Sequence, residues 1–159
     1  MGKKSIKEDK NIYQLSREEA GMTRAQASEA LVFISDSRVE KIESEKSEPH
    51  PDEILAMAKA YKKPLLCNYY CSNECPIGQH YVPEIESKNL AQITLEMLST
   101  INTLTKQKER LIEITADGKI SDDEKADFLK IQTELDKMSV SIDSLKLWVE
   151  QSIAEGKWK

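Results

Sequence analysis

Apolar residues recur at helical spacing along almost the whole chain, but the pattern changes near residue 84. Before that point the apolar positions form short groups separated by Gly, Pro, Ser and Thr, which predicts five short helices. The expected segments are 12–20, a second from the Thr23 cap to 31, a third that starts after Ser35 or Ser37, a fourth from Pro51 to 61, and 65–70. No run of residues favours strands.

After residue 84 the apolar positions form two long helical stripes. The first stripe contains Leu90, Ile93, Met97, Ile101, Leu104, Leu111 and Ile114. The second contains Phe128, Ile131, Leu135, Met138, Ile142, Leu145 and Val149, which follow one another by alternating steps of three and four residues. Such spacing is typical of coiled-coil packing. At 1.5 Å per residue, each helix is about 50 Å long. We therefore expect an all-α fold in which the short helices precede a long antiparallel two-helix hairpin.

Composition and charge narrow the class of protein. The chain has 23 Lys and Arg against 28 Asp and Glu, a net charge of −5, and the acidic excess lies after residue 63. Three cysteines, and a start without the apolar run of a secretory signal, predict a cytoplasmic protein. No stretch is apolar enough to predict a membrane span. Neither a phosphate-binding glycine loop nor a catalytic cluster is present, so we expect neither an enzyme nor a cofactor.

The first 70 residues contain an ordered set of motifs. They are the run from Arg17 to Gly21 before the Thr23 cap, the pair Ile42 and Glu43 at the end of the third helix, and the prolines before the fourth. In this order they resemble the lambda-repressor-like (XRE) helix-turn-helix family, over residues 11–66. The resemblance implies a five-helix DNA-binding domain whose third helix lies in the major groove of double-stranded DNA.

The resemblance also implies DNA-contacting residues. The set is Arg17, Thr23, Arg24, Ser35, Asp36, Ser37, Arg38, Lys41 and Lys46. The planar guanidinium group of arginine can pair with guanine or with phosphate. The ammonium group of lysine attracts the phosphate backbone of the DNA. The chain departs from the family pattern in two ways. The turn from Leu31 to Ser35 is one residue longer and lacks its glycine, and the third helix carries Asp36 and Glu40.

The cysteines form a second group. Cys67, Cys71 and Cys75 are four residues apart, and His80 follows. Four such ligands could close a tetrahedral zinc site, but the spacing matches no common zinc module. Ordinary packing of partly apolar thiols is the favoured interpretation, so we expect no metal.

Two helices alone leave apolar surface exposed, so the long hairpin predicts a homodimer. The expected dimerisation residues are Leu90, Met97, Ile101, Leu104, Phe128, Ile131, Leu135, Met138, Ile142, Leu145, Trp148 and Val149. The two helix-turn-helix domains of such a dimer would bind an operator that contains two half-sites.

These observations predict a flexible tail (1–10), a helix-turn-helix domain (11–71), a connector (72–83) and a dimerisation hairpin (84–159). The expected function is a sequence-specific transcriptional regulator, a repressor, that acts as a dimer on operator DNA. The alternative is a protein-interaction module, antitoxin-like or an adaptor, that uses the hairpin and keeps the helix-turn-helix as a scaffold.

Overall fold

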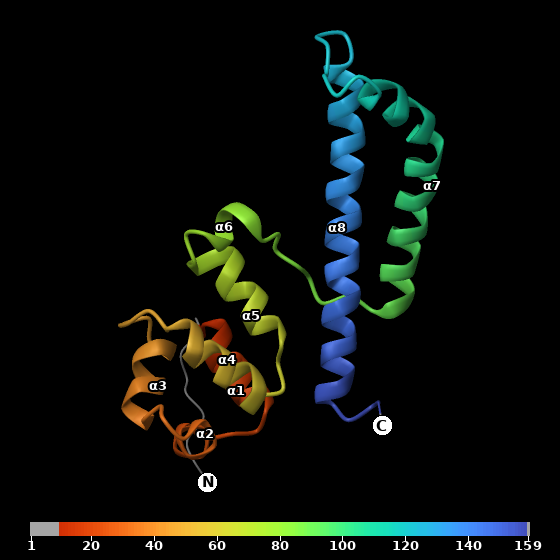
Figure 1. Ribbon diagram of the computed structural model, residues 1–159. Coiled ribbons are helices and arrows are strands. Elements are labelled where there is room, and N and C mark those ends of the chain that lie inside the picture. The colour runs from red at the N-terminus through yellow and green to blue at the C-terminus, as the bar shows by residue number, and fades with distance from the viewer. Residues whose placement is uncertain (1–9, 159) are drawn as a thin grey trace. The chain divides into compact units, whose positions relative to one another are not determined.

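The computed structural model describes residues 10–158, and within that range all regular structure is helical (Figure 1). The helices in chain order are α1 (Ile12–Glu19), α2 (Arg24–Leu31), α3 (Asp36–Glu43), α4 (Pro51–Ala60), α5 (Leu65–Tyr69), α6 (Gly78–Tyr81), α7 (Leu90–Thr115) and α8 (Lys125–Ala154). A π-helical segment, η1 (Tyr70–Glu74), continues α5. The expected all-α fold with a long hairpin is confirmed. The predicted tail lies outside the described residues except for Lys10.

The chain forms two compact units. The head unit comprises the chain through Glu84 together with the residues from Glu150 onward, and the hairpin unit is Ile85–Val149. The C-terminal end of α8 thus belongs to the head unit, where the Gln151 side chain donates a hydrogen bond to the Lys62 carbonyl at 3.1 Å. The predicted connector contains η1 in part and α6, two elements that the sequence pattern did not indicate.

Small polar residues start the helices of the head unit. Asn11, Thr23 and Ser35 precede α1, α2 and α3, and each side-chain oxygen accepts the backbone N–H three residues later. These caps satisfy donors that a helix start leaves unpaired. The core then forms from the inward faces of α1 to α5 and the turn before α3. Its buried apolar members are Tyr13, Ala27, Leu31, Ile34, Val39, Ile42, Ile54, Met57, Ala58, Tyr61 and Leu66.

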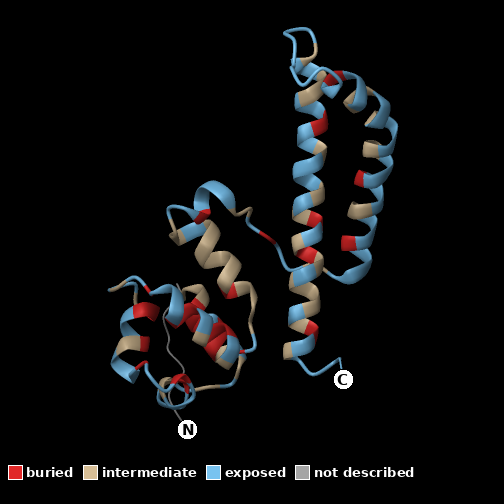
Figure 2. Cartoon of the chain, viewed as in Figure 1, coloured by how far each residue is buried: buried red, intermediate tan, exposed pale blue. Residues whose placement is uncertain are grey.

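The hairpin unit is packed less completely than the head unit. Ile93 and Ile114 of α7 and Ile131 of α8 are buried, but long stretches of both helices are exposed (Figure 2). Among the predicted dimerisation residues, Met97, Leu104, Phe128, Met138, Leu145, Trp148 and Val149 are half-buried, whereas Leu90, Ile101, Leu135 and Ile142 are exposed. A cavity of about 680 Å³ lies between the helices, beside Thr100 and Ser141. One hairpin by itself therefore does not use all of its apolar surface.

The turn between α2 and α3 is strained. Val32 has φ 63° and ψ −53°, and the Phe33 N–H donates to the Leu31 carbonyl at 2.7 Å, which defines a γ-turn of the rare positive-φ type. A β-branched side chain is a poor occupant of this backbone region. The glycine missing from the sequence motif would have removed the strain. The Val32 and Phe33 side chains are 88% and 61% exposed, so packing does not compensate.

Replacing the strained residue should stabilise the protein. We expect Val32→Gly to raise the free energy of unfolding by about 1 kcal/mol, because glycine adopts a positive φ without a Cβ clash. Urea unfolding followed by circular dichroism measures this change. Phe33→Gly is the control, since Phe33 is also exposed but its φ is not positive. A Val32→Gly protein that is no more stable than Phe33→Gly would contradict the assigned strain.

Candidate nucleic-acid interface

Helices α2 and α3 form the two arms of a helix-turn-helix. A reciprocal pair of hydrogen bonds fixes the start of α2, because Thr23 Oγ1 accepts from the Gln26 N–H at 3.2 Å while Gln26 Oε1 accepts from the Thr23 N–H at 2.9 Å. At the end of the turn, the Ser28 hydroxyl donates to the Ile34 carbonyl at 2.8 Å. The turn is therefore held from α2 even though it contains a strained residue.

Helix α3 has an inner apolar face and an outer polar face. Val39 and Ile42 are 0% and 2% exposed and pack into the core of the head unit. The exposed residues of α3 are Asp36, Ser37, Glu40 and Lys41. Because they are spaced by one, three and four residues, they share one side of the helix. This outer face is the surface that a DNA groove would meet, and it carries two carboxylates and one ammonium group.

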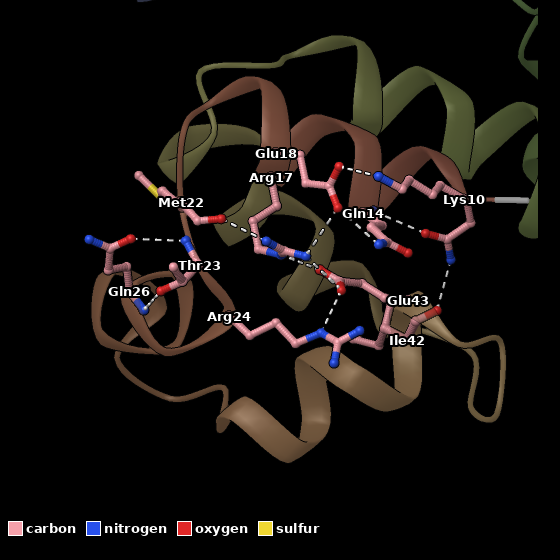
Figure 3. A network of polar contacts seen from close by, with 11 residues as sticks. Lys10, Gln14, Arg17, Glu18, Met22, Thr23, Arg24, Gln26, Ile42 and Glu43 are labelled. Atoms are coloured by element: carbon pink, nitrogen blue, oxygen red, sulfur yellow. Dashed lines mark hydrogen bonds and ion pairs between the residues drawn. The ribbon is translucent and has the colours of Figure 1, made fainter. Parts of the chain in front are cut away.

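A buried ionic network joins α1, α2 and α3 (Figure 3). The side chain of Glu43, at the end of α3, is 1% exposed. Arg17 of α1 donates to it from Nε and Nη2, and Arg24 of α2 donates from Nε to Glu43 Oε2 at 2.8 Å. Arg17 Nη1 also donates to the Met22 carbonyl at 2.6 Å. One carboxylate thus fixes the end of α3 against both preceding helices.

A second ionic network joins α3 to α4. Arg38 donates from Nε and Nη2 to both oxygens of Glu53, at 2.7 and 2.6 Å. It also donates to the Ser47 hydroxyl and to the Glu48 carbonyl in the loop between these helices. The Arg38 guanidinium holds the pKa of the Glu53 carboxyl below its ordinary value, despite the burial of that carboxyl. All three guanidinium nitrogens of Arg38 therefore have intramolecular partners.

The structure thus separates the predicted DNA-contacting residues into two groups. Arg17 is 6% exposed and Arg38 is committed to Glu53, so their positions do not fit the expected contacts with phosphate or bases. Both residues instead hold α3 in place. The other predicted residues lie at the surface of α2, α3 and the adjoining loop. These are Thr23, Arg24, Ser35, Asp36, Ser37, Lys41 and Lys46.

Two residues outside the predicted set lie beside this surface. Val32 and Phe33 expose apolar side chains immediately before α3. Apolar side chains can contact thymine methyl groups in the major groove. The missing glycine in the turn was the only sequence signal for this feature, and it indicated an altered backbone rather than an exposed aromatic ring.

The cysteines do not form a metal centre in the described part of the chain. Cys67, Cys71 and Cys75 are free and half-buried, and burial raises the pKa of the Cys67 thiol. The His80 ring instead makes an edge-to-face contact with Tyr81, with ring centroids 5.9 Å apart. Between residues 10 and 158, no three His, Cys, Asp or Glu side chains are grouped so that they could share a metal ion. The same residues contain no helix long and apolar enough to cross a bilayer.

The fold of α1 to α5 and the polar outer face of α3 define a helix-turn-helix domain. Residues 15–66 match the protein-family model described as helix-turn-helix. This part of the chain is therefore a helix-turn-helix of the XRE, lambda-repressor-like kind, a DNA-binding regulatory domain rather than an enzyme family. The match covers about a third of the chain and leaves the hairpin unit without an assignment. No match was found among curated proteins or among solved structures.

Removing the buried carboxylate should destabilise the head unit strongly. We expect Glu43→Ala to lower the free energy of unfolding by about 3 kcal/mol or more, because Arg17 would keep a buried charge without its partner. The double variant Arg17→Met, Glu43→Leu should recover part of this loss, since it removes both charges. Glu113→Ala, which breaks an exposed ion pair of α7, should cost about 0.5 kcal/mol at most. Equal stabilities of Glu43→Ala and Glu113→Ala in urea unfolding would contradict the role of this network.

Proposed function

We propose that the protein is a sequence-specific transcriptional regulator, a repressor, that binds operator DNA as a homodimer. The observation that carries the proposal is the outer face of α3, which two ionic networks hold exposed beside α2. In helix-turn-helix proteins this helix lies in the major groove and its N-terminal residues contact base edges. Here those residues are Ser35, Asp36 and Ser37.

The proposed contacts follow from the chemistry of each exposed side chain. Hydroxyl groups of Ser35 and Ser37 can donate to or accept from bases, and the Asp36 carboxylate suits the amino group of cytosine. We expect Lys41 and Lys46, which are both exposed, to contact the phosphate backbone of the DNA. Arg24 supplies a guanidinium whose Nε is bound to Glu43 and whose side chain is 35% exposed. Because few cations face outward, we expect low non-specific affinity and a weak dependence on salt.

Removing a positive charge and removing a negative charge from the outer face of α3 should change the affinity for DNA in opposite directions. We expect Lys41→Ala to weaken binding to a selected operator by about tenfold, and to reduce the slope of log affinity against log salt by about one. Glu40→Gln should strengthen binding, because a carboxylate on the outer face repels phosphate. Fluorescence anisotropy with labelled duplexes measures both affinities.

Lys130→Ala is the matched control for this test, since Lys130 is an exposed lysine of α8 with a 70% exposed side chain. It should bind like the wild type. Identical affinities for all four proteins would remove the outer face of α3 from the proposed interface.

Dimerisation would use apolar residues that the single hairpin leaves exposed. Leu90, Ile101 and Ile112 are spaced by eleven residues, close to three turns, so they line one side of α7. On α8, Leu135 and Ile142 lie one heptad apart and are 47% and 40% exposed. These five residues form the stripe that we propose as the dimer contact.

The two halves of the stripe lie on the same face of the hairpin. Ile101 follows the buried Thr100, and Ile142 follows the buried Ser141, so each is displaced by about 100° from the facing side of its helix. A two-fold axis normal to the plane of the hairpin exchanges two antiparallel helices and leaves the direction of that normal unchanged. Residues that are displaced by the same angle in the same sense on the two helices therefore point to the same face of the hairpin. A second copy placed on this face would complete a four-helix bundle.

Charges placed on this stripe should separate the copies. We expect Ile101→Glu and Ile142→Glu to shift the native mass from dimer to monomer, because each buries an unpaired carboxylate in the proposed contact. Sedimentation equilibrium or native mass spectrometry gives the mass. Leu129→Glu is the control, since Leu129 is 59% exposed but lies on another side of α8. A wild-type monomer, or a dimer that survives both substitutions, would refute the proposed contact.

A protein-interaction module is the second candidate, and the exposed carboxylates of Asp36 and Glu40 favour it. In that case the hairpin would bind another protein, and the helix-turn-helix would serve as a scaffold whose outer carboxylates disfavour DNA. Random-library DNA selection with the purified protein distinguishes the two. Enrichment of a two-part sequence supports the regulator, and failure to enrich any sequence at low salt supports the interaction module.

A further inference from the structure

The cavity in the hairpin unit, between α7 and α8, has a volume of about 680 Å³. Sites for small molecules commonly have volumes of about 300–1,000 Å³. None of the residues that line this cavity belongs to the head unit, so the cavity has no part in the proposed contact with DNA. Apolar and hydroxyl side chains form most of its wall, namely Leu95, Ser99 and Thr100 of α7 and Thr133, Val140 and Ser141 of α8.

The sizes of the facing side chains explain why α7 and α8 leave a space here. Near the turn of the hairpin, the facing sides carry the large buried side chains of Ile114 and Ile131. Between Ile93 and Ile114, the buried residue of α7 is Thr100, and the buried residue of α8 beside the cavity is Ser141. A hydroxyl side chain is shorter than that of isoleucine. It therefore leaves space unfilled where isoleucines set the distance between the helices.

The cavity opens on the face of the hairpin opposite to the stripe that we propose as the dimer contact. Its wall includes Ser99 and Val140, the residues that precede the buried Thr100 and Ser141. The stripe contains the residues that follow them. In an α-helix the two neighbours of a residue are displaced from it by about 100° in opposite senses. A second copy bound to the stripe would therefore leave the cavity accessible.

Ser141 contributes a buried hydroxyl group that has no partner. The residue is 4% exposed, and its hydroxyl makes no hydrogen bond within residues 10–158. The hydroxyls of Thr100 and Thr133, by contrast, donate to the carbonyls of Glu96 and Leu129 at 3.0 and 2.9 Å. Their oxygens keep lone pairs that can accept a hydrogen bond. Because buried polar groups nearly always have partners, Ser141 indicates a ligand group that accepts from its hydroxyl.

The charged side chains at the rim of the cavity balance one another. Two of them are lysines, Lys88 and Lys137, and two are carboxylates, Glu96 and Asp136. Lys88 donates to both oxygens of Glu96, at 3.0 and 2.9 Å, and Lys137 donates to Glu134 at 2.7 Å. A charged ligand would have to compete with these ion pairs. An uncharged ligand does not meet this cost, so the rim favours a neutral molecule.

We propose that this cavity binds an uncharged small molecule that has an apolar body and a hydroxyl or carbonyl oxygen. The oxygen accepts a hydrogen bond from the hydroxyl of Ser141, and the apolar body lies against Leu95 and Val140. Leu95 is 69% exposed, so binding removes apolar surface from water. The proposal depends neither on DNA binding nor on the dimer.

Fluorescence titration of the full-length protein with 6-propionyl-2-(dimethylamino)naphthalene tests the site. This probe is an uncharged aromatic ketone whose emission moves to shorter wavelength when it leaves water. We expect saturable binding with a dissociation constant below about 100 µM. Ser141→Ala should weaken binding about fivefold, because it removes the donor to the ketone oxygen. Ser141→Leu should weaken binding at least about tenfold, because the larger side chain fills the cavity.

Two matched controls and an exposed variant make the test specific. Ser139→Leu makes the same change at an exposed position of α8 outside the cavity, and it should bind like the wild type. Leu95→Gln alters an exposed side chain, so it should leave the fold intact and weaken binding severalfold. Leu55→Gln, at a 54% exposed leucine of α4, is its control and should bind like the wild type.

Circular dichroism should give the same helix content for all five variants. No saturable binding of the ketone to the wild type would overturn the proposal. Binding that Leu95→Gln and Ser141→Leu leave unchanged would also overturn it, because the probe would then lie on another apolar surface.

Discussion

The carboxylate of Glu43 is the contact on which the arrangement of the head unit depends. It stands at the end of α3 and accepts hydrogen bonds from Arg17 of α1 and Arg24 of α2, so three helices converge on one almost fully buried group. Burying these charges is costly, and the gain is geometric rather than energetic. An apolar contact would allow α3 to shift along its axis or to rotate about it. A carboxylate that accepts hydrogen bonds from two other helices fixes both the rotation of α3 and its position along its axis. The outer face of that helix is determined as a consequence.

The arginines that hold α3 in place are paired with carboxylates inside the protein, so they are not available to bind DNA. Arg38 holds α3 to α4, and Arg17 holds it to α1, which leaves Lys41 as the single cation among the exposed residues of the helix. Such a surface gains little from counterion release. Under the proposed function, most of its affinity for DNA would therefore come from hydrogen bonds to bases and from the linking of two DNA-binding domains in a dimer. The weakly cationic surface of α3 and the dimer that we propose for the hairpin therefore belong to one proposal.

Sequence reasoning predicted the elements that follow from local chemistry. Thr23 caps α2 as expected, and of the two serines considered for the start of α3 the cap is Ser35, because capping depends on near neighbours. The partners of Arg17 and Arg38 were not predicted. Both arginines match family positions that suit DNA, and only the tertiary fold shows that Glu43 and Glu53 lie within reach. The segment η1 was missed for a different reason, because turn-forming residues from Ser72 onward predicted a connector rather than a helix.

Long-range packing also explains why the heptad pattern was only a partial guide to the hairpin. A perfect seam would bury every a and d position, yet Leu135 and Ile142 are exposed while Thr100 and Ser141 are buried. The facing sides of α7 and α8 are thus rotated away from the apolar stripe toward small polar residues. A two-helix hairpin cannot bury a wide apolar stripe on both helices at once, because each helix offers its partner only one side. The rotation leaves part of the stripe exposed on one common face, where a second hairpin could bury it.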